Sequence, residues 1–155
     1  DEIREDMLQF GWDFAAMESR GLLKLIYHDP AQLGNLGPVL TRELSSLKAS
    51  RLVIDSTALI GLTVESPAQI RRRLLAVINA VKQLQCTAVL VSEVPEHAHA
   101  LSRFGVEEFI ADGVVQLHYE EGKRWLSIRK MRRTKHGASR YPFELTDHGI
   151  VLRKP

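Results

Sequence analysis

The sequence has few of the features that redox, covalent or membrane functions need. It contains one cysteine, Cys86, which can form no internal disulfide and has no C-x-x-C partner, so a reducing, cytoplasmic setting is the simplest interpretation. No apolar run approaches the ~18 residues that suggest a membrane span, and we expect no membrane partner. The motifs G-x-S-x-G and G-x-G-x-x-G are also missing, which removes the sequence signals for α/β-hydrolases and for dinucleotide binding.

The phosphate loop G-x-x-x-x-G-K-[ST] is absent as well. The pair Gly122-Lys123 has Leu117 where the first glycine of the loop should be and Arg124 where Ser or Thr should follow. The backbone cradle that such a loop offers to phosphates is therefore missing from this sequence. The first residue is Asp1 rather than Met, inside a predicted helix, and we expect the chain to be a piece of a longer protein.

Net positive charge is small overall, but Lys and Arg residues are concentrated late in the chain. Apolar residues make up 45% and charged residues 26%, as in ordinary globular domains, and the formal net charge is only +2. A basic cluster nevertheless follows Glu120 and Glu121, and such a cluster favours an anionic partner: a nucleotide, a nucleic acid or an acidic protein surface. The cluster consists of Lys123, Arg124, Arg129, Lys130, Arg132, Arg133, Lys135 and Arg140.

Hydrophobic spacing predicts helices that alternate with strands, followed by two hairpins. This order indicates an α/β domain with a mainly parallel sheet flanked by helices and an antiparallel C-terminal hairpin edge. We expect one partial domain over residues 1–155. The predicted helices cover 2–10, 13–20, 33–49 and 66–85, and the predicted strands cover 22–27, 51–56, 87–91, 114–119, 124–131, 143–146 and 150–152.

The apolar run Leu52-Val53-Ile54 ends abruptly in the carboxylate of Asp55. In open α/β sheets, ligands lie beyond the carboxyl ends of the strands. An apolar strand that ends in Asp is also how phosphate-handling ATPases hold Mg²⁺, directly or through water. Many strands end in a capping or turn Asp, so the pattern alone leaves both interpretations open.

Lys130 and Arg132 form the second candidate feature. Because alternate residues of a strand share a face, the spacing predicts that both point the same way and extend the row of Leu126 and Ile128. Two cations held in one direction by a rigid strand can clamp a phosphate. The alternative is an exposed edge strand whose charges prevent aggregation.

A zinc site at His97 and His99, completed by Glu93 and Glu96, is a third and weaker hypothesis. No further Cys or His lies at a matching spacing, so a solvated loop is the better interpretation.

The order of these features resembles the KaiC family of RecA-like ATPases. The resemblance covers essentially all 155 residues, and GVEEFIADG, KMR-x-T-x-H and TDHGI are its most specific parts. The segments that carry it are Phe10–Asp13, Arg51–Ser56, Ser92–Glu93, Gly105–Val115, Lys130–His136 and Leu145–Ile150.

The resemblance implies a RecA-like core and a ring, expected to be a hexamer, with ATP and Mg²⁺ held between subunits. It also implies a regulatory role with a regulatory protein partner. The implied site residues are Asp55 as the Walker B carboxylate near Mg²⁺, Glu93 as a sensor, Lys130 and Arg132 as fingers to the γ-phosphate of the neighbouring subunit, Thr134 and His136 near the ribose and phosphates, and Asp147 near the adenine.

Two departures from the family pattern matter. Arg133 stands where the family commonly has Gly, and the phosphate loop and paired catalytic glutamates are expected before Asp1. We therefore expect ATP hydrolysis from the complete domain and none from this chain alone. The alternatives are a RecA/RadA-like DNA-binding recombination or repair module and a non-catalytic scaffold. The low net charge and the lack of an aromatic stacking platform near the basic cluster weigh against DNA.

Overall fold

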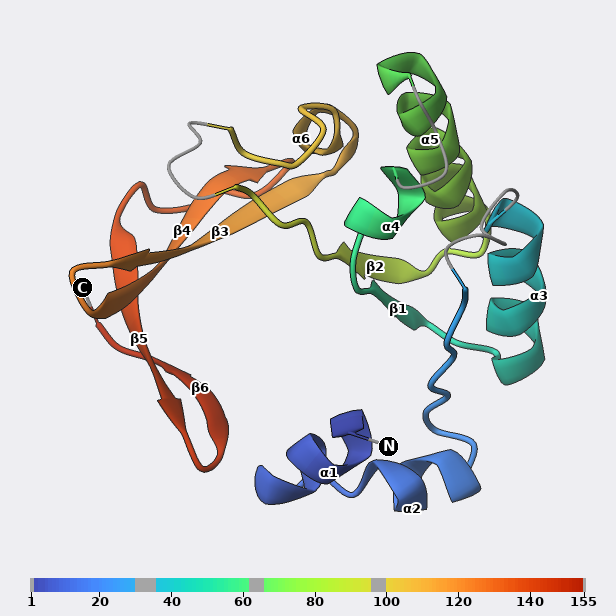
Figure 1. Cartoon of the computed structure of the whole chain (residues 1–155), viewed down its shortest axis with the longest axis horizontal. Coiled ribbons are helices and arrows are strands. Elements are labelled where there is room, and N and C mark those ends of the chain that lie inside the picture. The colour runs from blue at the N-terminus through green and yellow to red at the C-terminus, as the bar shows by residue number, and fades with distance from the viewer. Residues whose placement is uncertain (1, 30–35, 62–65, 96–99, 155) are drawn as a thin grey trace. The chain divides into compact units, whose positions relative to one another are not determined.

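The computed structural model describes residues 2–29, 36–61, 66–95 and 100–154. The chain divides into two compact units, one made of Asp1–Lys24 and Ala111–Pro155 and the other of Leu25–Ile110. Figure 1 shows helices and a parallel strand pair in the second unit, and a helical hairpin and an antiparallel sheet in the first. The predicted α/β class is therefore confirmed.

The unit Leu25–Ile110 is built on two short parallel strands. β1 (Arg51–Ile54) pairs with β2 (Thr87–Leu90) so that Arg51 lies opposite Thr87 and Ile54 opposite Leu90. The pairing continues beyond both strands, because the Val91 amide donates to the Ile54 carbonyl at 2.9 Å and the Thr57 amide donates to the Val91 carbonyl at 2.8 Å. The segments that follow the two strands are thus held together by backbone hydrogen bonds.

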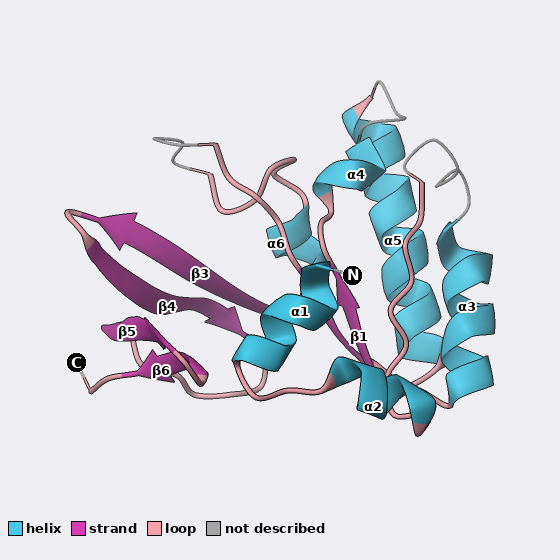
Figure 2. Ribbon diagram, turned by 60° about the horizontal axis from the view of Figure 1, so that its bottom comes forward, coloured by secondary structure: helices cyan, strands magenta, loops and turns pink. Residues whose placement is uncertain are grey.

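One face of this strand pair is covered by α3 (Leu36–Leu47) and α5 (Pro67–Gln83), which lie side by side in Figures 1 and 2. The predicted start of α5 is confirmed: the Ser66 side chain accepts from the Gln69 amide, and Pro67 is the first helical residue. Burial of apolar side chains between helices and strands is the main stabilising contribution, at about 1.5–3 kcal/mol for each large side chain. This core contains Leu40, Leu44, Val77, Val81 and Cys86, with Leu52, Ile54, Ala88 and Leu90 of the strands packed against it.

Two further short helices, α4 (Ala58–Gly61) and α6 (Glu107–Ile110), belong to a second cluster. Ile60, Ile70 and Leu74 are buried there, and Leu36, Phe104, Val106 and Ile110 pack against them. This cluster fixes the segment after β1 and the segment before Ala111 against the same side of α5.

The other unit contains a helical hairpin and a four-stranded antiparallel sheet. Arg4 of α1 (Glu2–Gln9) binds Glu18 of α2 (Phe14–Ser19) through two hydrogen bonds of 2.7 and 3.0 Å. The sheet order is β3-β4-β5-β6, as Figure 2 shows. Its strands are β3 (Gly113–Glu120), β4 (Lys123–Met131), β5 (Arg140–Thr146) and β6 (Gly149–Leu152).

Both predicted hairpins are present, but they form one sheet because β4 also pairs with β5. Among the described residues the antiparallel strands therefore outnumber the parallel ones. The predicted strand 22–27 is wrong, since Leu22–Tyr27 forms neither helix nor strand. Its composition favours a strand, but the Leu22 amide donates to the Met17 carbonyl of α2 at 2.9 Å, and Leu22 and Tyr27 are 64% and 88% exposed. No described helix has the length and apolar character that crossing a membrane requires.

Gly61 generates a stability prediction because the Phe104 ring lies against it. A Cβ at position 61 would lie 2.6 Å from Phe104 Cε1, closer than packed atoms allow. Gly61→Ala is therefore expected to lower the free energy of unfolding by about 1–3 kcal/mol, measured by urea denaturation. Gly37→Ala is the comparison variant, since beyond its adjacent residues its Cβ would meet nothing closer than 3.9 Å, and its effect should be smaller than that of Gly61→Ala. Equal effects of the two substitutions would contradict the packing of Phe104 on Gly61.

Candidate functional site

Asp55 and Glu93 lie at the same edge of the parallel strand pair. Asp55 follows β1 directly and is exposed, and its peptide bond to the buried Ser56 is cis. Glu93 follows β2 after two residues, and its Oε1 accepts a hydrogen bond of 3.2 Å from the Ser56 hydroxyl. Arg103 Nη1 lies 3.9 Å from the other oxygen of Glu93. The two predicted site carboxylates thus belong to segments that contact one another.

Beneath this edge lies a buried carboxylate that the sequence analysis did not single out. Glu107 of α6 is only 6% exposed. Its Oε1 accepts from the Ser92 hydroxyl at 3.1 Å and from the Thr57 hydroxyl at 3.4 Å. Its Oε2 accepts from the Val106 amide at 3.2 Å. Glu107 lies inside the GVEEFIADG motif, so the motif was the available signal, but spacing alone does not separate it from the adjacent Glu108.

The donors at this edge fit a magnesium ion that is shared with a phosphate ligand. Mg²⁺ usually keeps several waters and takes one or two carboxylates from the protein, with substrate phosphates supplying other ligands. Exposed Asp55 at a strand end matches that requirement. Within the described ranges no three His, Cys, Asp or Glu side chains gather to hold a metal by themselves. His97, His99 and Glu96 of the zinc hypothesis lie outside the described residues.

Lys130 and Arg132 both bind the segment that precedes β3. Lys130 Nζ donates to the Ala111 carbonyl at 2.7 Å. Arg132 Nη1 lies 3.0 Å from Asp112 Oδ1, and the Arg132 amide donates to the Asp112 carbonyl at 2.8 Å. The Arg132 side chain is held by its ion pair with Asp112 but remains 49% exposed to solvent.

The predicted row of Leu126, Ile128, Lys130 and Arg132 is wrong. Val115 pairs with Ile128 whereas Val114 pairs with Lys130, so β4 carries one extra residue, a β-bulge. Because cross-strand partners share a face, the bulge moves Lys130 to the face of Ser127. Arg132 lies beyond the end of β4, in a turn.

The remaining predicted residues lie in two loops of the antiparallel sheet and are exposed. Thr134 and His136 belong to the β4–β5 loop, where His136 Nδ1 lies 3.2 Å from the Gly137 carbonyl. Asp147 belongs to the β5–β6 turn. The structure therefore places Thr134 and His136 at one end of β5 and Asp147 at the other, and within one chain it does not bring all three together.

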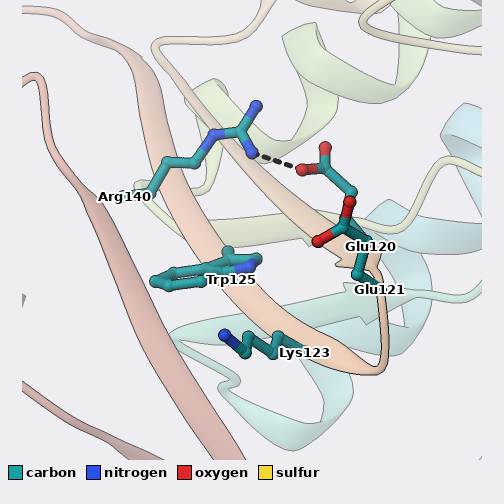
Figure 3. Close-up of a pocket in the computed structure, with 5 residues that line it drawn as sticks. All are labelled: Glu120, Glu121, Lys123, Trp125 and Arg140. Atoms are coloured by element: carbon teal, nitrogen blue, oxygen red, sulfur yellow. Dashed lines mark hydrogen bonds and ion pairs between the residues drawn. The ribbon is translucent and has the colours of Figure 1, made fainter.

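An open pocket of about 550 Å³ lies beside the β3–β4 turn. Figure 3 shows the Trp125 ring between the side chains of Lys123 and Arg140, with Glu120 and Glu121 at one side. Arg140 Nη1 forms an ion pair of 2.6 Å with Glu120 Oε2. The statement that the basic cluster lacks an aromatic platform is therefore wrong. The reason is the β4–β5 register, which pairs Trp125 with Pro142 and so carries the ring to the side of Arg140.

The same face of the sheet contains His118, whose Nε2 lies 3.0 Å from the Ser127 hydroxyl. Burial, and then the nearby Arg140, lower the pKa of His118 below its ordinary value. The lowered pKa favours the neutral imidazole, so His118 contributes less positive charge to the basic cluster than an ordinary histidine would.

A parallel strand pair covered by helices, with carboxylates after its strands, and a separate antiparallel sheet make this a mixed α/β protein. The chain belongs to the KaiC ATPase family, whose model matches residues 1–155.

The circadian clock oscillator protein KaiC of Synechococcus elongatus is 32% identical over 97% of this chain and 32% of its own length. A UPF0273 protein of Methanopyrus kandleri is 31% identical over 96% of this chain, which spans 66% of that relative. Among solved structures, a KaiC-like protein of Pyrococcus horikoshii matches with a TM-score of 0.87 and 37% identity, covering 99% of this chain and 70% of the other. The predicted family and RecA-like fold are thus confirmed.

Arg133 generates a prediction about the loop that follows Arg132. Its φ is +60°, in the left-handed region that favours glycine, and the family resemblance indicates glycine at this position. Arg133→Gly is expected to raise the free energy of unfolding by about 0.5 kcal/mol, since relief of the unfavourable φ exceeds the added entropy of the unfolded chain. Lys135→Gly, in the same loop but without a positive φ, should instead lower it. Thermal unfolding of both variants measures the difference, and destabilisation by Arg133→Gly would show that the Arg133 side chain matters more than its backbone.

Proposed function

We propose that this chain is the C-terminal part of a KaiC-like regulatory protein that assembles into a ring, binds ATP with Mg²⁺ and hydrolyses it to ADP and phosphate. The observation that carries this proposal is that Asp55 and Glu93 follow two paired parallel strands, and that Ser56, the residue after Asp55, donates a hydrogen bond to Glu93. Ligands of open α/β sheets bind at such an edge. Membership of the KaiC ATPase family supports the same reading. That family match spans both compact units, which supports treating residues 1–155 as one partial ATPase domain.

Asp55 is proposed to bind Mg²⁺ or its water ligands as the Walker B carboxylate. When bound, Mg²⁺ would neutralise charge on the β- and γ-phosphates. Glu93 is proposed as a sensor, because its carboxylate contacts both Ser56, next to Asp55, and Arg103. Through these contacts a change at Asp55 would reach the segment around Arg103.

Lys130 and Arg132 are proposed to stabilise the γ-phosphate of ATP bound by a neighbouring subunit. Their charges suit the negative charge that develops during phosphoryl transfer. Anchoring by Ala111 and Asp112 would restrict their motion and reduce the entropy lost on contact with phosphate.

Thr134 and His136 are proposed to bind the ribose and phosphates across the same subunit interface, and Asp147 to lie near the adenine. The strand β5 separates these two groups within one chain. A hexameric ring would allow one nucleotide to contact residues from more than one subunit.

The proposal predicts weak ATP binding and no hydrolysis by the 155-residue chain, because its sequence lacks the phosphate loop. Calorimetric titration with ATP should show an affinity that rises when Mg²⁺ is added. Asp55→Asn should remove this increase, with an expected loss of about tenfold in affinity, or ~1.4 kcal/mol. Asp6→Asn, a substitution at an exposed position of α1, is the matched control. Phosphate release above background, or full magnesium dependence in Asp55→Asn, would contradict the proposal.

A second candidate function, binding of single-stranded DNA, is favoured by the pocket in which Trp125 lies between Lys123 and Arg140 (Figure 3). Base stacking on an aromatic ring flanked by cations is a common mode of single-strand binding. Glu120 and Glu121 balance the charge of the two cations in this pocket, which makes it a poor site for a polyanion.

We therefore expect no stable complex with single-stranded DNA at moderate salt. A gel shift at low and moderate salt tests this expectation, because binding through Lys and Arg weakens steeply as salt rises. A complex that persists at moderate salt and is lost in Trp125→Ala would favour the DNA-binding function over the ATPase function.

A further inference from the structure

Glu107 is the buried charged group that joins the ends of both parallel strands. One oxygen, Oε1, accepts from Thr57, which follows β1, and from Ser92, which follows β2. Thr57 is fully buried at 0% exposure and Glu107 is 6% exposed, so these hydrogen bonds are shielded from water. A buried carboxylate that accepts several hydrogen bonds contributes strongly to local order, since loss of one partner leaves a polar group unsatisfied.

The two residues that Glu107 binds are close in sequence to the proposed site carboxylates. Thr57 is two residues after Asp55, and Ser92 immediately precedes Glu93. Ser92 also accepts a hydrogen bond of 3.2 Å from the Arg103 amide, so the segment that carries Arg103 joins the same network. The distance between the two strand ends thus depends on one glutamate oxygen, in addition to the backbone bonds of Thr57 and Val91.

We infer that Glu107 is a positioning residue that sets the orientation of Asp55 and Glu93 for a metal–triphosphate ligand, acting through Thr57 and Ser92. This inference rests on the proposed function. Glu107 itself does not touch the ligand, because its carboxylate is buried beneath the edge. Groups that hold a metal ligand in place commonly alter metal affinity by 10–100-fold when they are removed.

The adjacent Glu108 supplies a matched comparison. It lies in the same short helix and accepts a hydrogen bond from the hydroxyl of Ser102, which is 3% exposed. Ser102 does not follow either parallel strand. Ser92→Ala and Ser102→Ala therefore each remove one serine hydroxyl bound to a glutamate of α6, but only the first acts on a strand end.

The first measurement is hydrogen exchange at the Thr57 and Val91 amides, whose hydrogen bonds connect the two strand ends. Ser92→Ala and Glu107→Gln should speed exchange at both amides by about tenfold, because each weakens the network that closes this edge. Ser102→Ala should leave both rates unchanged. Unchanged rates in Ser92→Ala, or equal acceleration in Ser102→Ala, would overturn the inference whether or not the chain binds ATP.

The second measurement separates positioning from a general loss of structure. ATP affinity is titrated with and without Mg²⁺ in the same variants. Ser92→Ala and Glu107→Gln should lower the magnesium-dependent gain in affinity by about tenfold and leave metal-free affinity unchanged. An equal loss with and without Mg²⁺ would overturn the positioning role. A magnesium effect absent already from the unsubstituted chain would count against the proposed function, and the exchange rates would still decide whether Glu107 orders the strand ends.

Discussion

The parallel pairing of β1 with β2 is the constraint on which the candidate site depends. Each strand has only four residues, and one face of the pair is covered by α3 and α5. On the opposite face Val53 and Val89 are 65% and 56% exposed. Burial on one side gives such short strands limited stability, so the bonds beyond their ends matter more than they would in a longer sheet. The backbone hydrogen bonds of Thr57 and Val91, and the hydrogen bonds to the Glu107 carboxylate, hold the two segments together beyond the strand ends.

The antiparallel sheet uses a different means to fix its functional side chains. The β-bulge in β4 shifts Lys130 from one face to the other just before the strand ends. Bulges commonly redirect side chains near binding sites. Here the redirected Lys130 and the following Arg132 both return to the segment Ala111–Asp112. The cations are thus held by hydrogen bonds to one short segment, instead of by strand alternation.

The sequence allowed prediction of features that depend on local chemistry. The α5 cap at Ser66 and Pro67 and the carboxylate that follows β1 both arise from residues adjacent in the chain. Features that depend on pairing between distant residues could not be predicted. The bulge requires knowledge of the β3–β4 register, and the proximity of Trp125 to Arg140 requires the β4–β5 register. The role of Glu107 could not be predicted for the same reason, because its partners Thr57 and Ser92 lie fifty and fifteen residues away in the sequence.

The contacts made by Glu107, Ala111 and Asp112 give a physical reason why the sequence motif Gly105–Gly113 needs particular residues. Glu107 binds the strand ends of one unit, whereas Ala111 and Asp112 bind Lys130 and Arg132 of the other. At the last position a Cβ on Gly113 would lie 2.9 Å from Met131 Sδ, so a larger residue would require the Met131 side chain to move. Only the four residues of α6 separate the segment before Glu107 from Ala111. The motif therefore fixes, within a few residues of chain, both the carboxylates proposed to act on the metal and the cations proposed to act on the phosphate of a neighbouring subunit. Substitutions of Glu107 should consequently affect the strand-end carboxylates and substitutions of Asp112 the cations, whereas substitutions in the exposed β5–β6 turn should affect neither.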